Sequence, residues 1–192
     1  MSQAAEVFAL SIQDAENLLG HFNALNTKPP PPETEVLKRA GLIMAMTAWE
    51  TYVEDSLQEV AGRRLAKLKD ASIASFVRTR LDNEIKQLHN PDSAKTIRLF
   101  RDYAGIDLSA GWAWNHFPTK LVCERLNQYL KLRGDVVHRS RAASLGDQPT
   151  PHPVKKDDLE RVIIFIKNLV KATEAALAAA PSPSAPAPSA SG

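Results

Sequence analysis

The chain has 192 residues, of which 44% are hydrophobic and 24% are charged, and its formal net charge is +2. This length suggests one domain that buries a core without disulfides or metals, and the single Cys123 excludes an intramolecular disulfide. The small net charge neither requires nor forbids a polyanionic partner, so a nucleic-acid hypothesis depends on local clusters of charge.

The beginning of the chain and its apolar stretches favour a cytoplasmic location. The start, MSQAAEVFALS, has no basic segment followed by an apolar one, as a secretion signal would. The apolar stretch AGLIMAMTAW is far shorter than the ~20 residues that cross a bilayer. We therefore predict a soluble, cytoplasmic protein with no membrane partner.

Apolar residues recur at helical spacing along most of the chain, and no alternating Val/Ile/Thr run is long enough for a strand. The spacing predicts helices near 3–26, 33–69 and 71–89, a fourth opened by HNPDSAKTIRLF, a fifth from Pro118 to LRGDVVHRS, and a last near 155–180. In the first helix the pattern places these apolar residues on the inner side: Val7, Leu10, Ala15, Leu18 and Phe22. For the fourth, Asn90 or Asp92 is a candidate N-cap, with Pro91 suited to the first turn.

We therefore predict an all-α, up-and-down bundle of about five to six helices in residues 1–180. The Pro/Ser/Ala-rich segment 181–192 contains no large apolar residue, so it cannot order itself by burial and is predicted to be a disordered tail. The segment GWAWNHF falls in the loop before the fifth helix. Its tryptophans either stack on a nucleobase or cap the apolar end of the bundle.

The predicted second helix carries one charged residue, Glu50, between Ala40 and Val53. Burying a carboxylate without a partner is costly. Either the helix turns this position to solvent, or Glu50 pairs with a cation of the fifth helix. Arg133 is the favoured partner.

Several kinds of site have no motif in this sequence. The five histidines form no H-x-x-x-H or H-E-x-x-H pair, and one cysteine makes no zinc cluster. Neither a G-x-G-x-x-G nor a Walker sequence occurs, and no nucleophile elbow marks a catalytic serine. We therefore predict no metal and no other cofactor.

The segment LRGDVVHRS allows two interpretations. Arg133-Gly134-Asp135 matches an adhesion tripeptide, but an adhesion ligand would have to be secreted. Alternatively, Arg133 and His138 form part of an acid–base site, because histidine titrates near neutral pH and the arginine fork matches phosphate oxygens. Lys131, Arg139 and Arg141 make this the densest cationic stretch near any histidine.

Geometry limits the second interpretation, since five residues of ideal helix leave Arg133 and His138 ~140° apart. The two side chains converge within one chain only if the helix loosens, which Gly134 makes easier. Without such loosening they are a surface arginine and a histidine at a helix end.

Three segments, in this order and over roughly residues 1–175, resemble the RiboL-PSP-HEPN family of the HEPN superfamily. They are MAMTAWETYVEDSLQEV, NPDSAKTIRLFRDYAGID and LNQYLKLRGDVVHRS, the last with an R-x4-H motif. Many such proteins are metal-independent ribonucleases that act as dimers, with the motifs of both chains lining one cleft. The resemblance implies that Arg133 is the motif arginine and His138 the motif histidine.

The chain departs from the family pattern at two positions. The residue after the motif arginine is usually polar, often Asn, and here it is Gly134, so Asp135 would have to supply the polar contact. Some relatives carry a tyrosine, two residues after the histidine, that a partner nucleotidyltransferase modifies. This chain has Ser140 there, so we do not expect that regulation.

The resemblance implies a homodimeric endoribonuclease that cleaves RNA through its 2′-hydroxyl, in a toxin or defence role with a cognate antitoxin or another protein partner. Arg133 and His138 would be catalytic, and Glu50 and Asp135 supporting. The residues expected to contact RNA are Lys131, Arg139 and Arg141. The alternative is a catalytically inactive HEPN-like scaffold that binds RNA, a nucleotide or a protein.

Overall fold

The computed structural model describes residues 1–27, 31, 34–139 and 154–180, apart from the side chains at 138 and 139. The helices in these residues are α1 (Gln3–Leu25), α2 (Glu35–Leu65), α3 (Ala71–Lys86), α4 (Ser93–Ala104), α5 (Thr119–Arg139), α6 (Lys156–Ala179) and the short 3-10 helix η2 (Leu108–Gly111). Beyond one isolated bridge between Trp114 and Phe117, the described part of the chain holds no β-structure. The predicted all-α fold is confirmed, and the predicted tail 181–192 lies outside the described residues.

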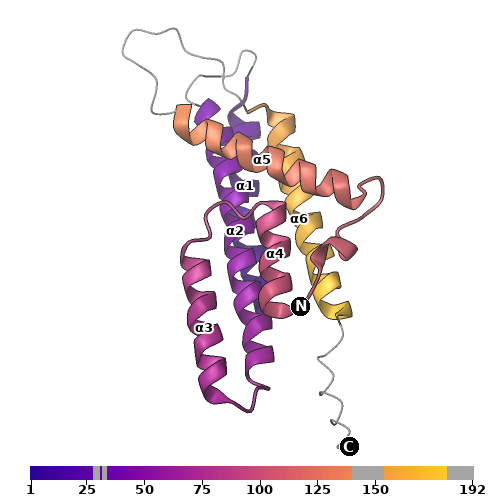
Figure 1. The fold of residues 1–192 in the computed structure, drawn as a ribbon. Coiled ribbons are helices and arrows are strands. Elements are labelled where there is room, and N and C mark those ends of the chain that lie inside the picture. Colours follow the sequence, from indigo (N-terminus) through magenta and orange to yellow (C-terminus); the bar gives the residue numbers. More distant parts are fainter. Residues whose placement is uncertain (28–30, 32–33, 140–153, 181–192) are drawn as a thin grey trace, which may run out of the picture.

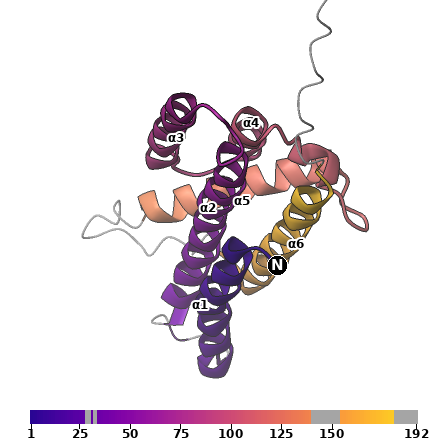
Figure 2. The same cartoon turned by 90° about the horizontal axis from the view of Figure 1, so that it is seen from below.

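Helix α2 is the central element of the bundle. It packs against α1 along much of its length and also contacts α3, α4, α5 and α6. Figure 1 shows α5 lying across the upper part of the bundle, whereas the other helices run closer to its long axis, and Figure 2 shows α1 beside α2 from below. The apolar stretch of α2 is buried as its composition predicts, with Leu42, Met46 and Trp49 fully inside. In the described residues no helix is long and apolar enough to cross a membrane.

The inner face of α1 is as predicted at Ala15 and Phe22 but not at Val7 and Leu10. Val7 is 37% exposed and Leu10 is 68% exposed. The buried residues of α1 are Ala4, Ala5, Phe8, Ile12, Ala15 and Phe22. This stripe also has helical spacing, but it begins with two alanines, which carry little hydrophobic signal. The two larger apolar residues lie beside the stripe.

Helix α4 begins and ends at residues with identifiable capping roles. Asp92 is the N-cap, and its Oδ1 accepts a hydrogen bond from Lys95 N at 2.8 Å. Gly105 ends the helix with φ +60°, a left-handed conformation that favours glycine. Of the two predicted caps the structure therefore uses Asp92. Pro91 precedes the cap instead of occupying the first turn, and its carbonyl accepts a hydrogen bond from Trp49.

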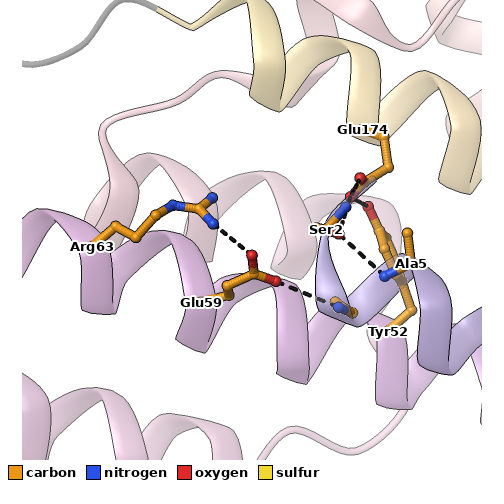
Figure 3. Close-up of polar contacts among 7 residues, drawn as sticks. Ser2, Ala5, Tyr52, Glu59, Arg63 and Glu174 are labelled. Atoms are coloured by element: carbon orange, nitrogen blue, oxygen red, sulfur yellow. Dashed lines mark hydrogen bonds and ion pairs between the residues drawn. The ribbon is translucent and has the colours of Figure 1, made fainter.

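A polar network holds the start of α1 against α2 and α6, as Figure 3 shows. Ser2 donates to Glu174 from both its backbone nitrogen and its hydroxyl, at 3.1 and 2.8 Å, and the Tyr52 hydroxyl donates to the same carboxylate at 2.9 Å. Burial, reinforced by Glu174, raises the pKa of Tyr52 far above its ordinary value. The phenol therefore stays a neutral donor, and the carboxylate is satisfied from two helices.

The tryptophan loop caps the bundle, as one of its two interpretations predicts. Trp112 is fully buried, and its indole nitrogen donates to Thr173 Oγ1 of α6 at 3.0 Å. Trp114 stacks on Phe117, with ring centroids 5.6 Å apart, and both rings contact Phe165 of α6. These contacts fix the beginning of α5, the helix that carries the predicted catalytic pair.

Candidate functional site

Helix α5 runs without interruption through Gly134 to Arg139, so the loosening that would bring Arg133 and His138 together within one chain is not found. Residues 133 and 138 therefore stand ~140° apart in the register of one helix. His138 and Arg139 belong to its last turn, but their side chains are not among those described. Arg141 lies outside the described residues altogether.

The Arg133 side chain is held by an ion pair with Glu50. Arg133 Nη1 lies 2.9 Å from Glu50 Oε2, and the two side chains are only 21% and 16% exposed. Glu50 is thus neither turned to open solvent nor left unpaired. The predicted contact between α2 and α5 is confirmed.

Asn90 is a third member of this contact and joins both partners. Arg133 Nη1 donates to Asn90 Oδ1 at 2.6 Å, and the backbone nitrogen of Asn90 donates to Glu50 Oε1 at 3.2 Å. Asn90 has φ +53°, a left-handed conformation that asparagine tolerates better than most residues. We call Glu50, Asn90 and Arg133 the arginine clamp.

The connection between α3 and α4, which carries Asn90, is tied to both neighbouring helices. From α2, Trp49 Nε1 donates to the carbonyl of Pro91 at 3.1 Å in a buried contact. On the other side, Ser93 N donates to Asn127 Oδ1 of α5 at 3.0 Å. Figure 1 shows this connection passing next to α5. The clamp therefore rests on three segments that hold one another, which fixes the direction of the guanidinium.

A surface pocket of about 390 Å³ adjoins the clamp. Its lining residues come from the connection, from α4 and from α5: His89, Asn90, Asp92, Lys95, Asn127, Leu130 and Lys131. Lys131, which was predicted to contact RNA, is exposed at this pocket. Its neighbours His89, Lys95 and Asn127 were not predicted as site residues.

A second carboxylate of α2, Glu54, lies one turn after Glu50. Partial burial raises the pKa of Glu54, and the negative charges of Glu50 and Asp55 raise it further. His89 acts in the opposite direction and lowers the pKa of this carboxyl. Helix α2 thus places two carboxylates near the connection between α3 and α4. Of these, Glu50 is paired with Arg133.

Two residues next to Arg133 bear on the predicted supporting contacts. Asp135 is half-buried, and its side chain has no hydrogen bond or ion pair within the described part of the chain. Its supporting role stays a prediction. At Gly134 an added Cβ would meet no heavy atom within 4 Å, so the position has room for a side chain. Across the described residues, no three side chains of metal-ligating type gather into a group.

The three sequence segments that suggested a family meet at this site. They contribute Glu50 from α2, the connection leading into α4, and Arg133 from α5. The family model described as RiboL-PSP-HEPN matches residues 10–179, from within α1 to the last residue of α6. The chain belongs to the RiboL-PSP-HEPN family. The resemblance inferred from the three segments is confirmed.

Membership of the RiboL-PSP-HEPN family suggests a ribonuclease-type or nucleotide-binding function. Neither the comparison with curated proteins nor the comparison with solved structures finds a match. In the described residues of the RiboL-PSP-HEPN domain, the arginine clamp and the adjoining pocket bring together the cationic and polar side chains that could bind a phosphate.

Proposed function

We propose that this RiboL-PSP-HEPN protein is an endoribonuclease that cleaves RNA by attack of the 2′-hydroxyl on the adjacent phosphorus. Arg133 and His138 are its catalytic residues. The observation that carries the proposal is the arginine clamp, since Glu50 and Asn90 both engage Nη1 of Arg133. Within the described residues, Nε and Nη2 have no hydrogen-bond acceptor. These two donors are available to a phosphate, because the geometry of a guanidinium matches that of phosphate oxygens.

At phosphorus, the proposed reaction forms one bond and breaks one, and two proton transfers accompany it. A base takes the proton of the 2′-hydroxyl, and the oxygen bonds to phosphorus. The bond from phosphorus to the 5′-oxygen then breaks, and an acid protonates the leaving oxygen. The products are a 2′,3′-cyclic phosphate and a 5′-hydroxyl. In this scheme His138 transfers protons and Arg133 stabilises the added negative charge at phosphorus.

Helical register supports a site shared between two chains. On the continuous helix α5, positions 133 and 138 are ~140° apart, so the two groups serve one phosphate more readily if they come from different copies. The reaction removes a proton from the 2′-oxygen and adds one to the 5′-oxygen, which is also easier with two histidines than with one. We therefore place both Arg133–His138 segments of a two-fold homodimer across one cleft.

Light scattering at micromolar concentration should accordingly give the mass of a dimer. Mixing the Arg133→Ala protein with the His138→Ala protein should restore part of the cleavage, because the heterodimer keeps one Arg133 and one His138, from different copies, in the shared cleft. A monomer would contradict the shared site, whereas an inactive mixture despite subunit exchange would show that both histidines are required.

Gly134 favours a second candidate function, a catalytically silent scaffold that binds RNA, a nucleotide or a protein. The usual polar residue after the motif arginine is missing, and among the described residues the Asp135 side chain makes no hydrogen bond or ion pair in its place. A scaffold would bind its ligand but leave RNA intact, and substitution of His138 would not lower its affinity.

Gly134→Ala separates a rigid site from one that needs a loosened helix. There is room for the methyl group, and alanine is favoured over glycine in a helix interior by about 0.8–1.0 kcal/mol. We expect a free energy of unfolding higher by about that amount in urea titrations, with RNA cleavage retained. Gly134→Asn is the matched variant, and the polar group should raise cleavage above that of Gly134→Ala. Loss of cleavage in a more stable Gly134→Ala protein would show that loosening is required.

The biological setting that we propose, a toxin or defence component, rests on the family alone. It implies a cognate antitoxin or another protein partner. RNA contacts by Lys131, Arg139 and Arg141 are part of the same proposal. They imply that RNA affinity falls as salt increases, because binding releases counterions from the phosphates.

Substrate comparison tests the proposed reaction directly. Purified protein should cleave an RNA oligonucleotide, whereas DNA and RNA with a single 2′-O-methyl group at the scissile nucleotide should resist, because both lack the nucleophile. Robust cleavage of DNA would overturn the proposal. Tight binding of RNA without any cleavage would favour the scaffold.

A further inference from the structure

We infer that the pocket beside the arginine clamp is a subsite for a second RNA phosphate, held by Lys95, Asn127 and Lys131. This inference rests on the proposed function and adds Lys95 and Asn127, which neither the family motif nor the sequence pattern indicates, to the predicted Lys131. Arg133 itself does not line the pocket, although Asn90 belongs to both the pocket and the clamp. A phosphate in the pocket is therefore not the one that Arg133 contacts, but that of a neighbouring nucleotide.

The two lysines of the pocket supply positive charge that carboxylates do not neutralise. Lys95 Nζ donates to the backbone carbonyl of His89 at 3.3 Å, and neither Lys95 nor Lys131 has an ion pair within the described residues. The one acid of the lining, Asp92, accepts the backbone N–H of Lys95 at the first turn of α4. Its charge is offset by that helix end. The ammonium groups are thus available to an anion.

Asn127 adds a directed neutral donor to the pocket. Its Oδ1 accepts the hydrogen bond from Ser93 N at 3.0 Å, which assigns the other end of the amide as the nitrogen. That nitrogen has no acceptor in the part of the chain that the structure describes. Leu130, which is 8% exposed, supplies an apolar part of the lining. Two cations, one amide donor and an apolar surface suit a phosphodiester with its sugar.

Substrate length distinguishes this subsite from the catalytic site. Lys95→Ala should raise KM about 3–10-fold for an RNA pentanucleotide, with little change in kcat, since a contact away from the reacting atoms supplies binding. A dinucleoside monophosphate has no second phosphate. With this substrate, Lys95→Ala and the wild type should therefore have the same KM. Lys120→Ala removes an exposed lysine at the other end of α5 and is the matched control. Equal KM for wild type and Lys95→Ala on the pentanucleotide would overturn the subsite.

The affinity for an RNA analogue that cannot be cleaved tests the subsite independently of the proposed nuclease activity. With a fluorescent 2′-O-methyl pentanucleotide, Lys95→Ala and Lys131→Ala should each weaken the affinity about 3–10-fold. Each should also reduce the slope of log K against log salt by about 0.7. Such losses in a protein that cleaves no RNA would contradict the nuclease but retain the subsite. Unchanged binding in both variants, or no binding of RNA by the wild type, would overturn the subsite.

Discussion

RNA cleavage should fall by about 10²–10⁴-fold when His138 is replaced by alanine, because that is the contribution of a positioned proton-transfer group. The decrease should appear in kcat. The affinity for a 2′-O-methyl oligonucleotide should stay within a few-fold of wild type, since in the proposed mechanism the imidazole only transfers protons, whereas Arg133 and the lysines bind the phosphates. Single-turnover rates on RNA and fluorescence anisotropy with the methylated analogue measure the two quantities separately.

His21→Ala is the matched control for His138→Ala. His21 is exposed on α1, so its removal should leave both cleavage and binding unchanged. If one copy of His138 acts as base and the other as acid, the wild-type rate should follow a bell-shaped curve around neutral pH. Full activity of His138→Ala would contradict the assignment. Reduced binding of the analogue in step with reduced cleavage would show that the residue holds the RNA.

The second large effect is expected at the clamp. Glu50→Gln should lower the free energy of unfolding by about 1–3 kcal/mol, because it removes a charge-assisted contact and leaves the largely buried Arg133 without its counter-charge. Cleavage should fall as well, since a neutral amide holds the guanidinium less firmly than the carboxylate does. Urea titration at neutral pH gives the stability, and single-turnover cleavage gives the activity.

Glu54→Gln is the control for that experiment and should shift stability in the opposite direction. Partial burial and the neighbouring carboxylates raise the pKa of Glu54 above its ordinary 4.5. A raised carboxyl pKa favours the folded state at acid pH, and that contribution is lost as pH rises through the folded-state pKa. At pH 7 the variant should therefore melt slightly above wild type, and the difference should vanish below pH 4.5. If both substitutions lowered the free energy of unfolding, loss of any carboxylate here would destabilise the fold. The effect of Glu50→Gln could then not be assigned to the ion pair with Arg133.

Local signals explain why most of the fold could be predicted. A capping aspartate marks the start of α4 and Gly105 its end, and helical periodicity marks the long elements between such signals. Apolar spacing was wrong for the first two turns of α1, because it favours the large Val7 and Leu10 over the small Ala4 and Ala5 that the structure buries. Contacts with α2 and α6, not side-chain size, decide which stripe is buried.

The candidate site was predictable only in part. The pairing of Glu50 with Arg133 followed from the energetic cost of a lone carboxylate in an apolar stretch. The part played by Asn90 depends on its left-handed φ and on the path of the connection between α3 and α4, which no local pattern encodes. Lys95 and Asn127 reach the same pocket only because the connection packs on α5.

The end groups of RNA fragments test the proposed chemistry most directly. Purified protein incubated with a defined RNA in excess EDTA should release fragments that end in a 2′,3′-cyclic phosphate and begin with a 5′-hydroxyl, as mass spectrometry identifies. His138→Ala purified in parallel should release none above background, which excludes a contaminating nuclease. Fragments with 3′-hydroxyl and 5′-phosphate ends would contradict attack by the 2′-hydroxyl, and cleavage only when magnesium is supplied would contradict a metal-independent reaction.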